Sequence, residues 1–172
     1  MKHSAALPLT WVILRVLIVL NWLGGAGICT LLIATIVAEQ WTFTALGIQP
    51  DSYIRPIITG LRAIAALGLV AVPLNHTVLK RLKAIVETVR GGDAFVAANA
   101  DRLHTIAWTL LALQLLSIII GGIGKAISTP AHPLHLDAGF SVSAWLAVFL
   151  TFVLARVFAE GTRMREDLEG TV

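Results

Sequence analysis

The sequence has few charged residues and only one cysteine. Charged side chains make up 13% of the 172 residues, whereas soluble globular domains carry about a quarter. The single cysteine, Cys29, lies in an apolar run and excludes an intrachain disulfide. Hydrophobic residues make up 57% of the chain, and the mean hydropathy is +0.84. This composition indicates a membrane protein.

Catalytic motifs are also absent from the sequence. It contains no GxSxG nucleophile elbow, no HExxH zinc motif and no glycine-rich phosphate-binding loop. No close pair of carboxylates falls within an apolar run. We therefore expect no enzymatic activity and no cofactor, and we expect no direct binding of nucleic acid.

Four apolar segments are long enough to cross a membrane, which requires about 20 residues in a helix. They cover about residues 10–37, 56–74, 106–123 and 140–158. The sequence therefore predicts an all-α polytopic membrane protein, a four-helix bundle that forms a single domain over residues 1–172. The first segment is too long for a signal peptide and is interrupted by Arg15, so we expect it to be retained. The second segment ends near Pro73, and the glycines at 121–124 together with Pro130 and Pro133 are expected to break the chain into a loop after the third.

Residues 75–105 form the longest polar interval and predict a helical hairpin outside the membrane. Apolar residues recur there at spacings of three and four, which is typical of an amphipathic helix: Val78, Leu82, Ile85 and Val89. Gly91 and Gly92 are expected to end this helix, because glycine accepts the left-handed conformation of a C-terminal turn. Asp93 is expected to cap a second helix. We further expect the second span to continue as helix past Leu74, and the fourth to continue past Phe158.

The basic residues predict the orientation of the chain. Most of them fall on one side of the predicted spans: Lys2, Lys80, Arg81, Lys83, Arg90, Arg102, Arg163 and Arg165. The loops on the other side contain only Arg55 and Lys125. Because positive charge is retained in the cytoplasm, we expect both termini and the 75–105 hairpin to be cytoplasmic.

Four polar residues lie within the apolar segments and are candidate functional residues: Arg15, Asn21, Arg62 and Gln114. Arg15 and Arg62 lie about two turns from the ends of their segments and can extend toward lipid headgroups. Glu39 is a candidate ion-pair partner for Arg62. Asn21 and Gln114 are candidates for hydrogen bonds between helices.

Two further groups of residues suggest binding sites. His132, His135 and Asp137 are of the types that bind zinc, although Asp137 can also cap the fourth helix and no fourth ligand is apparent. A candidate surface on the hairpin consists of Lys80, Arg81, Lys83, Arg90 and Phe95. Its charges are explained by the orientation rule alone, by contact with anionic lipid, or by docking of a cytoplasmic protein.

Residues 91–99, the following Arg102-Leu103 and Trp108, and the ending 154–161 resemble a known family. It consists of small four-span inner-membrane proteins of bacteria, catalogued only as a domain of unknown function (DUF). Its members are often encoded beside a small regulator of the Cro/C1 helix-turn-helix type. The sequence has Ala94 where the family usually has proline, and Ala107 where glycine is frequent. The resemblance implies the bacterial inner membrane and suggests that regulator as a partner, but it implies no activity.

Two functional hypotheses follow from these observations. The first is a non-enzymatic membrane sensor or regulatory partner that acts through the hairpin and the C-terminal tail. The second is a small transporter or channel, in which Arg62, Asn21 and Gln114 line a polar path. The second hypothesis requires a homo-oligomer, since a lone four-helix bundle packs without a pore. The concentration of polar residues in the predicted cytoplasmic segments favours the first.

Overall fold

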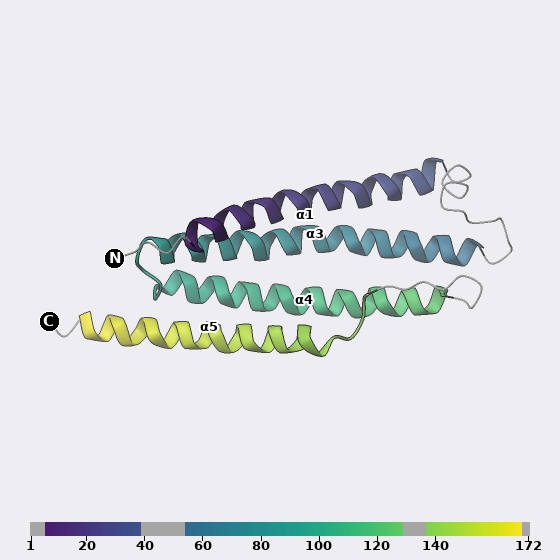
Figure 1. Cartoon of the computed structure of the whole chain (residues 1–172). Helices are drawn as coiled ribbons and strands as arrows, with labels where there is room; N and C mark the ends of the chain where they lie inside the picture. The colour runs from purple at the N-terminus through teal and green to yellow at the C-terminus, as the bar shows by residue number, and fades with distance from the viewer. Residues whose placement is uncertain (1–5, 39–53, 129–136, 170–172) are drawn as a thin grey trace. The chain divides into compact units, whose positions relative to one another are not determined.

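The structure is a computed structural model, which describes residues 6–38, 54–128 and 137–169. The described residues form four α-helices and no strand (Figure 1), so the all-α prediction is confirmed. The helices are α1 (Ala6–Val37), α3 (Ile54–Arg90), α4 (Ala97–Ile127) and α5 (Val142–Glu169). Each is long and apolar enough to cross a membrane. This finding indicates a multi-pass membrane protein.

Two helices continue beyond the predicted membrane spans, as expected. Helix α3 runs without interruption through Pro73 to Arg90. Proline removes one hydrogen bond within a helix, but it does not end α3 here. Helix α5 continues well past Phe158 to Glu169. Both predicted continuations are therefore confirmed.

The expectation that the chain breaks at glycines 121–124 is wrong, whereas Pro130 and Pro133 lie outside the described residues. Helix α4 includes all three of these glycines and ends at Ile127. A Cβ atom on Gly121 would lie 2.5 Å from the carbonyl oxygen of Ala138. Glycine is therefore needed there because another backbone segment approaches α4 closely, and the helix itself is not interrupted.

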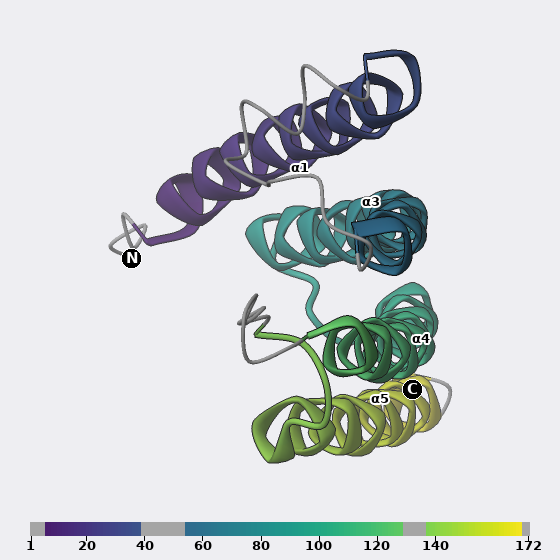
Figure 2. The same ribbon diagram turned by 90° about the vertical axis from the view of Figure 1, so that its right-hand side faces the viewer.

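The chain divides into two compact units, and one of them contains the hairpin. This hairpin unit consists of Met1–Leu20, Leu74–Leu113 and Ser141–Val172. Within it, α5 lies beside the N-terminal part of α4 in both views (Figures 1 and 2). The ring of Phe152 packs against Trp108, and the ring of Phe158 packs against Phe95. As the residue number rises along α5 it falls along the opposing segment, so these two segments are antiparallel.

The second compact unit consists of Asn21–Pro73 and Gln114–Phe140. Its packing depends on glycines, so we call it the glycine unit. A Cβ on Gly25 of α1 would lie 3.0 Å from the side chain of Val72 on α3. A Cβ on Gly60 of α3 would lie 2.6 Å from the side chain of Ile127 on α4. Small residues of this kind let membrane helices pack closely.

Large apolar side chains are exposed along all four helices. On α1, for example, Leu23 is 62% exposed and Val37 is 79% exposed. Contiguous apolar surface of this extent is rare on soluble monomers. Hydrocarbon tails of a bilayer provide the environment that such surfaces require.

Candidate functional site

The candidate site begins at the turn between α3 and α4. Gly92 has a backbone φ of +87°, which glycine adopts without strain. The amide of Gly92 donates to the carbonyl of Val89, and the amide of Asp93 donates to the carbonyl of Thr88, both at 3.1 Å. These two bonds form a Schellman motif, which satisfies the last carbonyls of α3. The predicted turn at Gly91 and Gly92 is therefore confirmed.

The prediction that Asp93 caps the next helix is wrong. Helix α4 begins four residues later, at Ala97. Its first turn includes a hydrogen bond of 2.9 Å from the amide of Asn99 to the carbonyl of Val96. The Asp93 carboxylate instead accepts a hydrogen bond from the guanidinium of Arg165 on α5 and forms an ion pair with it. The carboxylate thus joins two segments that lie 72 residues apart in the chain.

Residues 93–96 carry the ring of Phe95 to helix α5. The centroids of the Phe95 and Phe158 rings are 5.2 Å apart. Gly161, one turn further along α5, leaves room for the Phe95 ring, because a Cβ there would lie 2.9 Å from its Cδ1 atom. The Phe95 side chain is nevertheless 46% exposed, so it is only half enclosed.

A buried asparagine connects the turn to both hairpin helices. Asn99 is 0% exposed, and its amide nitrogen donates to the hydroxyl of Thr88 at 2.8 Å and to the carbonyl of Ala94 at 2.9 Å. Its amide oxygen accepts from the guanidinium of Arg102 at 2.8 Å. The same guanidinium donates to the carbonyl of Ala84 at 3.2 Å. Buried polar groups satisfied in this way fix one arrangement of the surrounding segments.

Our sequence reasoning did not single out Asn99 as a site residue. One signal was available, because Asn99, Leu103 and Ile106 fall at spacings of four and three, which places them on one helix face. All three are buried. A lone asparagine on the apolar face of a helix requires hydrogen-bond partners from another segment.

A second group of side chains surrounds Trp11 of α1. The guanidinium carbon of Arg15 lies 4.0 Å from the centroid of the Trp11 ring, and the ammonium nitrogen of Lys83 lies 5.2 Å from it. The indole N–H donates to a carboxylate oxygen of Glu87 at 3.1 Å, and Lys83 forms an ion pair with Glu87 at 3.6 Å. Arg15 therefore has a cation–π partner in the hairpin unit.

The candidate surface on the hairpin is only partly a free surface. Lys80, Arg81 and Arg90 are exposed. Lys83 is directed to Trp11 and Glu87, as described above, and Phe95 packs on α5. Three residues of the candidate surface are therefore exposed charges, and the other two, Lys83 and Phe95, contact neighbouring side chains within the protein.

The remaining polar residues of the apolar segments each bond a main-chain carbonyl in the glycine unit. Asn21 donates to the carbonyl of Val72 at 3.0 Å. Gln114 is buried and donates to the carbonyl of Gly139 at 3.1 Å. Arg62 donates to the carbonyl of Thr35 near the end of α1, where a cation is favourable because helix carbonyls point toward it. Glu39, the expected partner of Arg62, lies outside the described residues.

The predicted metal ligands fall largely outside the described part of the chain. His132 and His135 are not among the described residues, and Asp137 is exposed. Among residues 6–38, 54–128 and 137–169, no group of three histidine, cysteine or acidic side chains is placed to hold a metal ion. The hypothesis of a metal site therefore stays a prediction.

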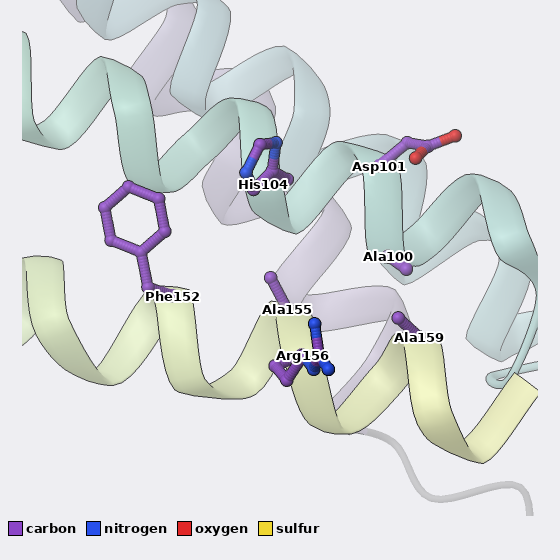
Figure 3. A pocket seen from close by; sticks show the side chains of 7 residues that line it. All are labelled: Ala100, Asp101, His104, Phe152, Ala155, Arg156 and Ala159. Carbon is purple, nitrogen blue, oxygen red and sulfur yellow. The ribbon is translucent and has the colours of Figure 1, made fainter.

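A groove lies between α4 and α5 in the hairpin unit (Figure 3). Its volume is about 340 Å³, and it is lined by Ala100, Asp101, His104, Phe152, Ala155, Arg156 and Ala159. The His104 ring packs edge-on against Phe152, with centroids 5.9 Å apart. The indole N–H of Trp108 donates to Nε2 of His104 at 3.3 Å, so Nε2 is the accepting nitrogen of that ring.

Comparison with known proteins identifies a family. A family model described as "Protein of unknown function (DUF2975)" matches residues 55–172, more than half of the chain. The chain belongs to this family. The expectation of a DUF family is therefore confirmed. Neither the curated proteins nor the solved structures that were compared with the chain contain a significant match.

The DUF2975 region includes most of the candidate site. Residues 55–172 contain the turn at Gly92, the Asn99 network and the groove between α4 and α5. Helix α1 precedes the matched region, so Trp11 reaches Glu87 of the DUF2975 region from outside it.

Proposed function

We propose that this DUF2975 protein is a non-enzymatic membrane sensor or regulatory partner, which acts through its 75–105 hairpin and the C-terminal end of α5. One observation carries the proposal: the Asp93–Arg165 ion pair and the Phe95–Phe158 contact hold the hairpin turn against α5. Two segments that are distant in sequence thereby form one polar surface with a fixed geometry. Such a surface is suited to recognise a protein partner, because little ordering is needed when the partner binds.

The exposed charges suggest the chemistry of that partner. Lys80, Arg81 and Arg90 are exposed on the hairpin and present positive charge to a partner with an acidic surface. The family resemblance suggests a small helix-turn-helix regulator of the Cro/C1 type. We further propose that this surface lies on the cytoplasmic side of a bacterial inner membrane, as the distribution of basic residues favours.

The transport hypothesis receives less support from the contacts. It requires Asn21, Arg62 and Gln114 to present polar groups to a path. Each of these side chains instead donates to a main-chain carbonyl of a neighbouring segment.

Purification from native membranes tests the proposed partner. We expect a small helix-turn-helix protein to be recovered with the tagged protein and identified by mass spectrometry. The variant Lys80→Gln/Arg81→Gln/Arg90→Gln should recover at least about fivefold less, because loss of about 1 kcal/mol in affinity has that effect. The matched control is Arg55→Gln/Lys125→Gln, which changes two exposed basic residues of the glycine unit. Recovery of no such regulator above the level in an untagged strain contradicts the proposal.

Reporter fusions test the orientation independently. A reporter placed at Gly91 should behave as cytoplasmic, and one placed at Ala131 should behave as external. The same fusions in the triple Gln variant check that its orientation is unchanged, since basic residues contribute to topology. The opposite result at both positions would show that the orientation is inverted.

A further inference from the structure

The groove between α4 and α5 contains two charged side chains of opposite sign that have no partner in the described structure. Asp101 lines it from α4, and Arg156 lines it from α5. Both residues are exposed. Within residues 6–38, 54–128 and 137–169, neither the Asp101 carboxylate nor the Arg156 guanidinium forms a hydrogen bond or ion pair, with the other or with any other residue.

The floor of the groove is made of small side chains, which leave space between the helices. Ala100 of α4 faces Ala155 and Ala159 of α5 across it (Figure 3). The resulting volume of about 340 Å³ falls in the range of small-ligand sites, about 300–1,000 Å³. The groove therefore has room for a small polar group beside Arg156, and Asp101 lies at its edge on α4 with its carboxylate directed away from α5 (Figure 3).

The groove also lies where both helices change from polar to apolar. On α5, the exposed residues before Arg156 include Phe149, Leu150, Val153 and Leu154. Those after it include Glu160, Arg163 and Arg165. On α4, the polar first turns end near Asp101 and His104, and Trp108 follows one turn later. Trp108 is 56% exposed, and exposed tryptophan is enriched at the level of lipid headgroups.

From these observations we propose that the groove binds the headgroup of a zwitterionic phospholipid that carries a phosphate and a primary ammonium, as in phosphatidylethanolamine. Arg156 binds the phosphate by charge-assisted hydrogen bonds, and Asp101 accepts hydrogen bonds from the ammonium. The glycerol backbone lies over the alanines, and the acyl chains follow the exposed apolar residues of α5.

The pair of opposite charges distinguishes this ligand from other lipids. A purely anionic headgroup is attracted by Arg156 but repelled by Asp101, and it leaves the carboxylate without a partner. A zwitterionic headgroup satisfies both side chains at once. The proposal concerns a lipid site and does not depend on the protein partner proposed above.

Native mass spectrometry of the full-length protein tests the proposal. The purified protein is incubated with palmitoyl-oleoyl phosphatidylethanolamine or with phosphatidylglycerol of the same acyl chains, and bound lipid is counted. We expect phosphatidylethanolamine to be retained about fivefold better than phosphatidylglycerol. Asp101→Asn should abolish this preference, because phosphatidylglycerol no longer meets a repelling charge. Arg156→Gln should lower retention of both lipids about fivefold.

The matched control is Arg163→Gln, which removes an exposed arginine from the same helix at a position outside the groove. Retention of both lipids should be unchanged in this variant. Equal retention of the two lipids by the wild type, or an Asp101→Asn variant that keeps the preference, overturns the proposal.

Discussion

The hairpin unit and the glycine unit use their polar side chains in different ways. In the hairpin unit, polar side chains bond one another, as in the contacts of Asn99 with Thr88 and of Trp11 with Glu87, in addition to main-chain carbonyls. In the glycine unit, Asn21, Arg62 and Gln114 all donate to main-chain carbonyls. Close approaches at glycine occur in both units, but only in the glycine unit does one of them, at Gly121, admit another backbone; Gly161 of the hairpin unit admits the Phe95 ring.

This difference indicates how each unit is stabilised. Side-chain networks and ion pairs hold particular segments in register, so each link depends on the identity of two side chains. Close helix packing depends on the absence of a side chain, so the identity of the neighbouring residue matters less. Substitutions in the two units should therefore destabilise the protein for different physical reasons, and the following predictions test this.

The largest effect is expected in the Asn99 network. Asn99→Ala removes one of the two partners of Arg102 and leaves the Ala94 carbonyl without its donor. Buried groups left unsatisfied should lower the free energy of unfolding by about 3 kcal/mol. Denaturant titration of the purified protein in mild detergent measures this change. The control is Asn75→Ala, at an exposed position of α3. An equal loss of stability in both variants would show that the hydrogen bonds of Asn99 do not cause it.

A smaller effect is expected from Gly121→Ala in the glycine unit. The added methyl group meets the carbonyl of Ala138, so the backbone must shift at a cost of about 2 kcal/mol. The adjacent Gly122→Ala places its methyl group in open space and should stabilise α4 by about 0.8 kcal/mol through helix propensity. Thermal unfolding of the two variants should shift in opposite directions. A shift in the same direction would show that close approach does not govern this position.

Phe95→Ala should have a moderate effect. Truncation of a fully buried phenylalanine costs about 3–5 kcal/mol, but the Phe95 ring is 46% exposed, so about 1.5 kcal/mol is expected. Phe149→Ala is the control, because that ring is 64% exposed on α5. Unfolding monitored in detergent should distinguish them. If the two variants lose the same stability, the contact between Phe95 and Phe158 contributes nothing specific.

The smallest effect is expected for the Asp93–Arg165 ion pair. Both side chains are about half exposed, so Arg165→Gln should cost only about 0.5 kcal/mol, and salt should reduce the difference. Hydrogen exchange of the amides at 91–95 should become faster in this variant at low salt. Arg163→Gln, which removes an intrahelical pair with Glu160, should leave exchange in the turn unchanged. Faster exchange in both variants would mean that the turn responds to the net charge of α5.

The helices and the turn could be predicted because their causes are local. Hydropathy identified the four apolar segments, and the Gly91-Gly92 pair indicated a turn that requires a positive φ. The role of Asp93 could not be predicted in the same way, because its partner Arg165 lies 72 residues further along the chain. Local preference favoured a cap at Asp93, and the distant guanidinium determined its actual contact.

The same limit explains the error at the glycines of α4 and the absence of a predicted groove. Gly121 resembles a helix breaker in the sequence. In the structure a side chain is excluded there because the backbone of residues 138–139 approaches α4 closely. Asp101 and Arg156 are ordinary surface charges on their own helices, and only the pairing of α4 with α5 brings them to one groove. Sequence periodicity shows which residues share a face of one helix. It does not show which residues of two neighbouring helices lie opposite each other.

The non-helical segment before α5 has its backbone polar groups satisfied by side chains of α4, which matters in a bilayer. Residues 137–141 are not helical, yet Gly139 lies against Gln114 and Ser117, which fall in the middle of the predicted 106–123 span. The Ser117 hydroxyl contacts the Gly139 amide at 3.1 Å, and the Gln114 amide contacts its carbonyl at 3.1 Å. A peptide group transferred bare into hydrocarbon costs several kcal/mol. Here two side chains of α4 satisfy the amide and the carbonyl of Gly139, so this irregular stretch of backbone would tolerate a depth from which water is absent.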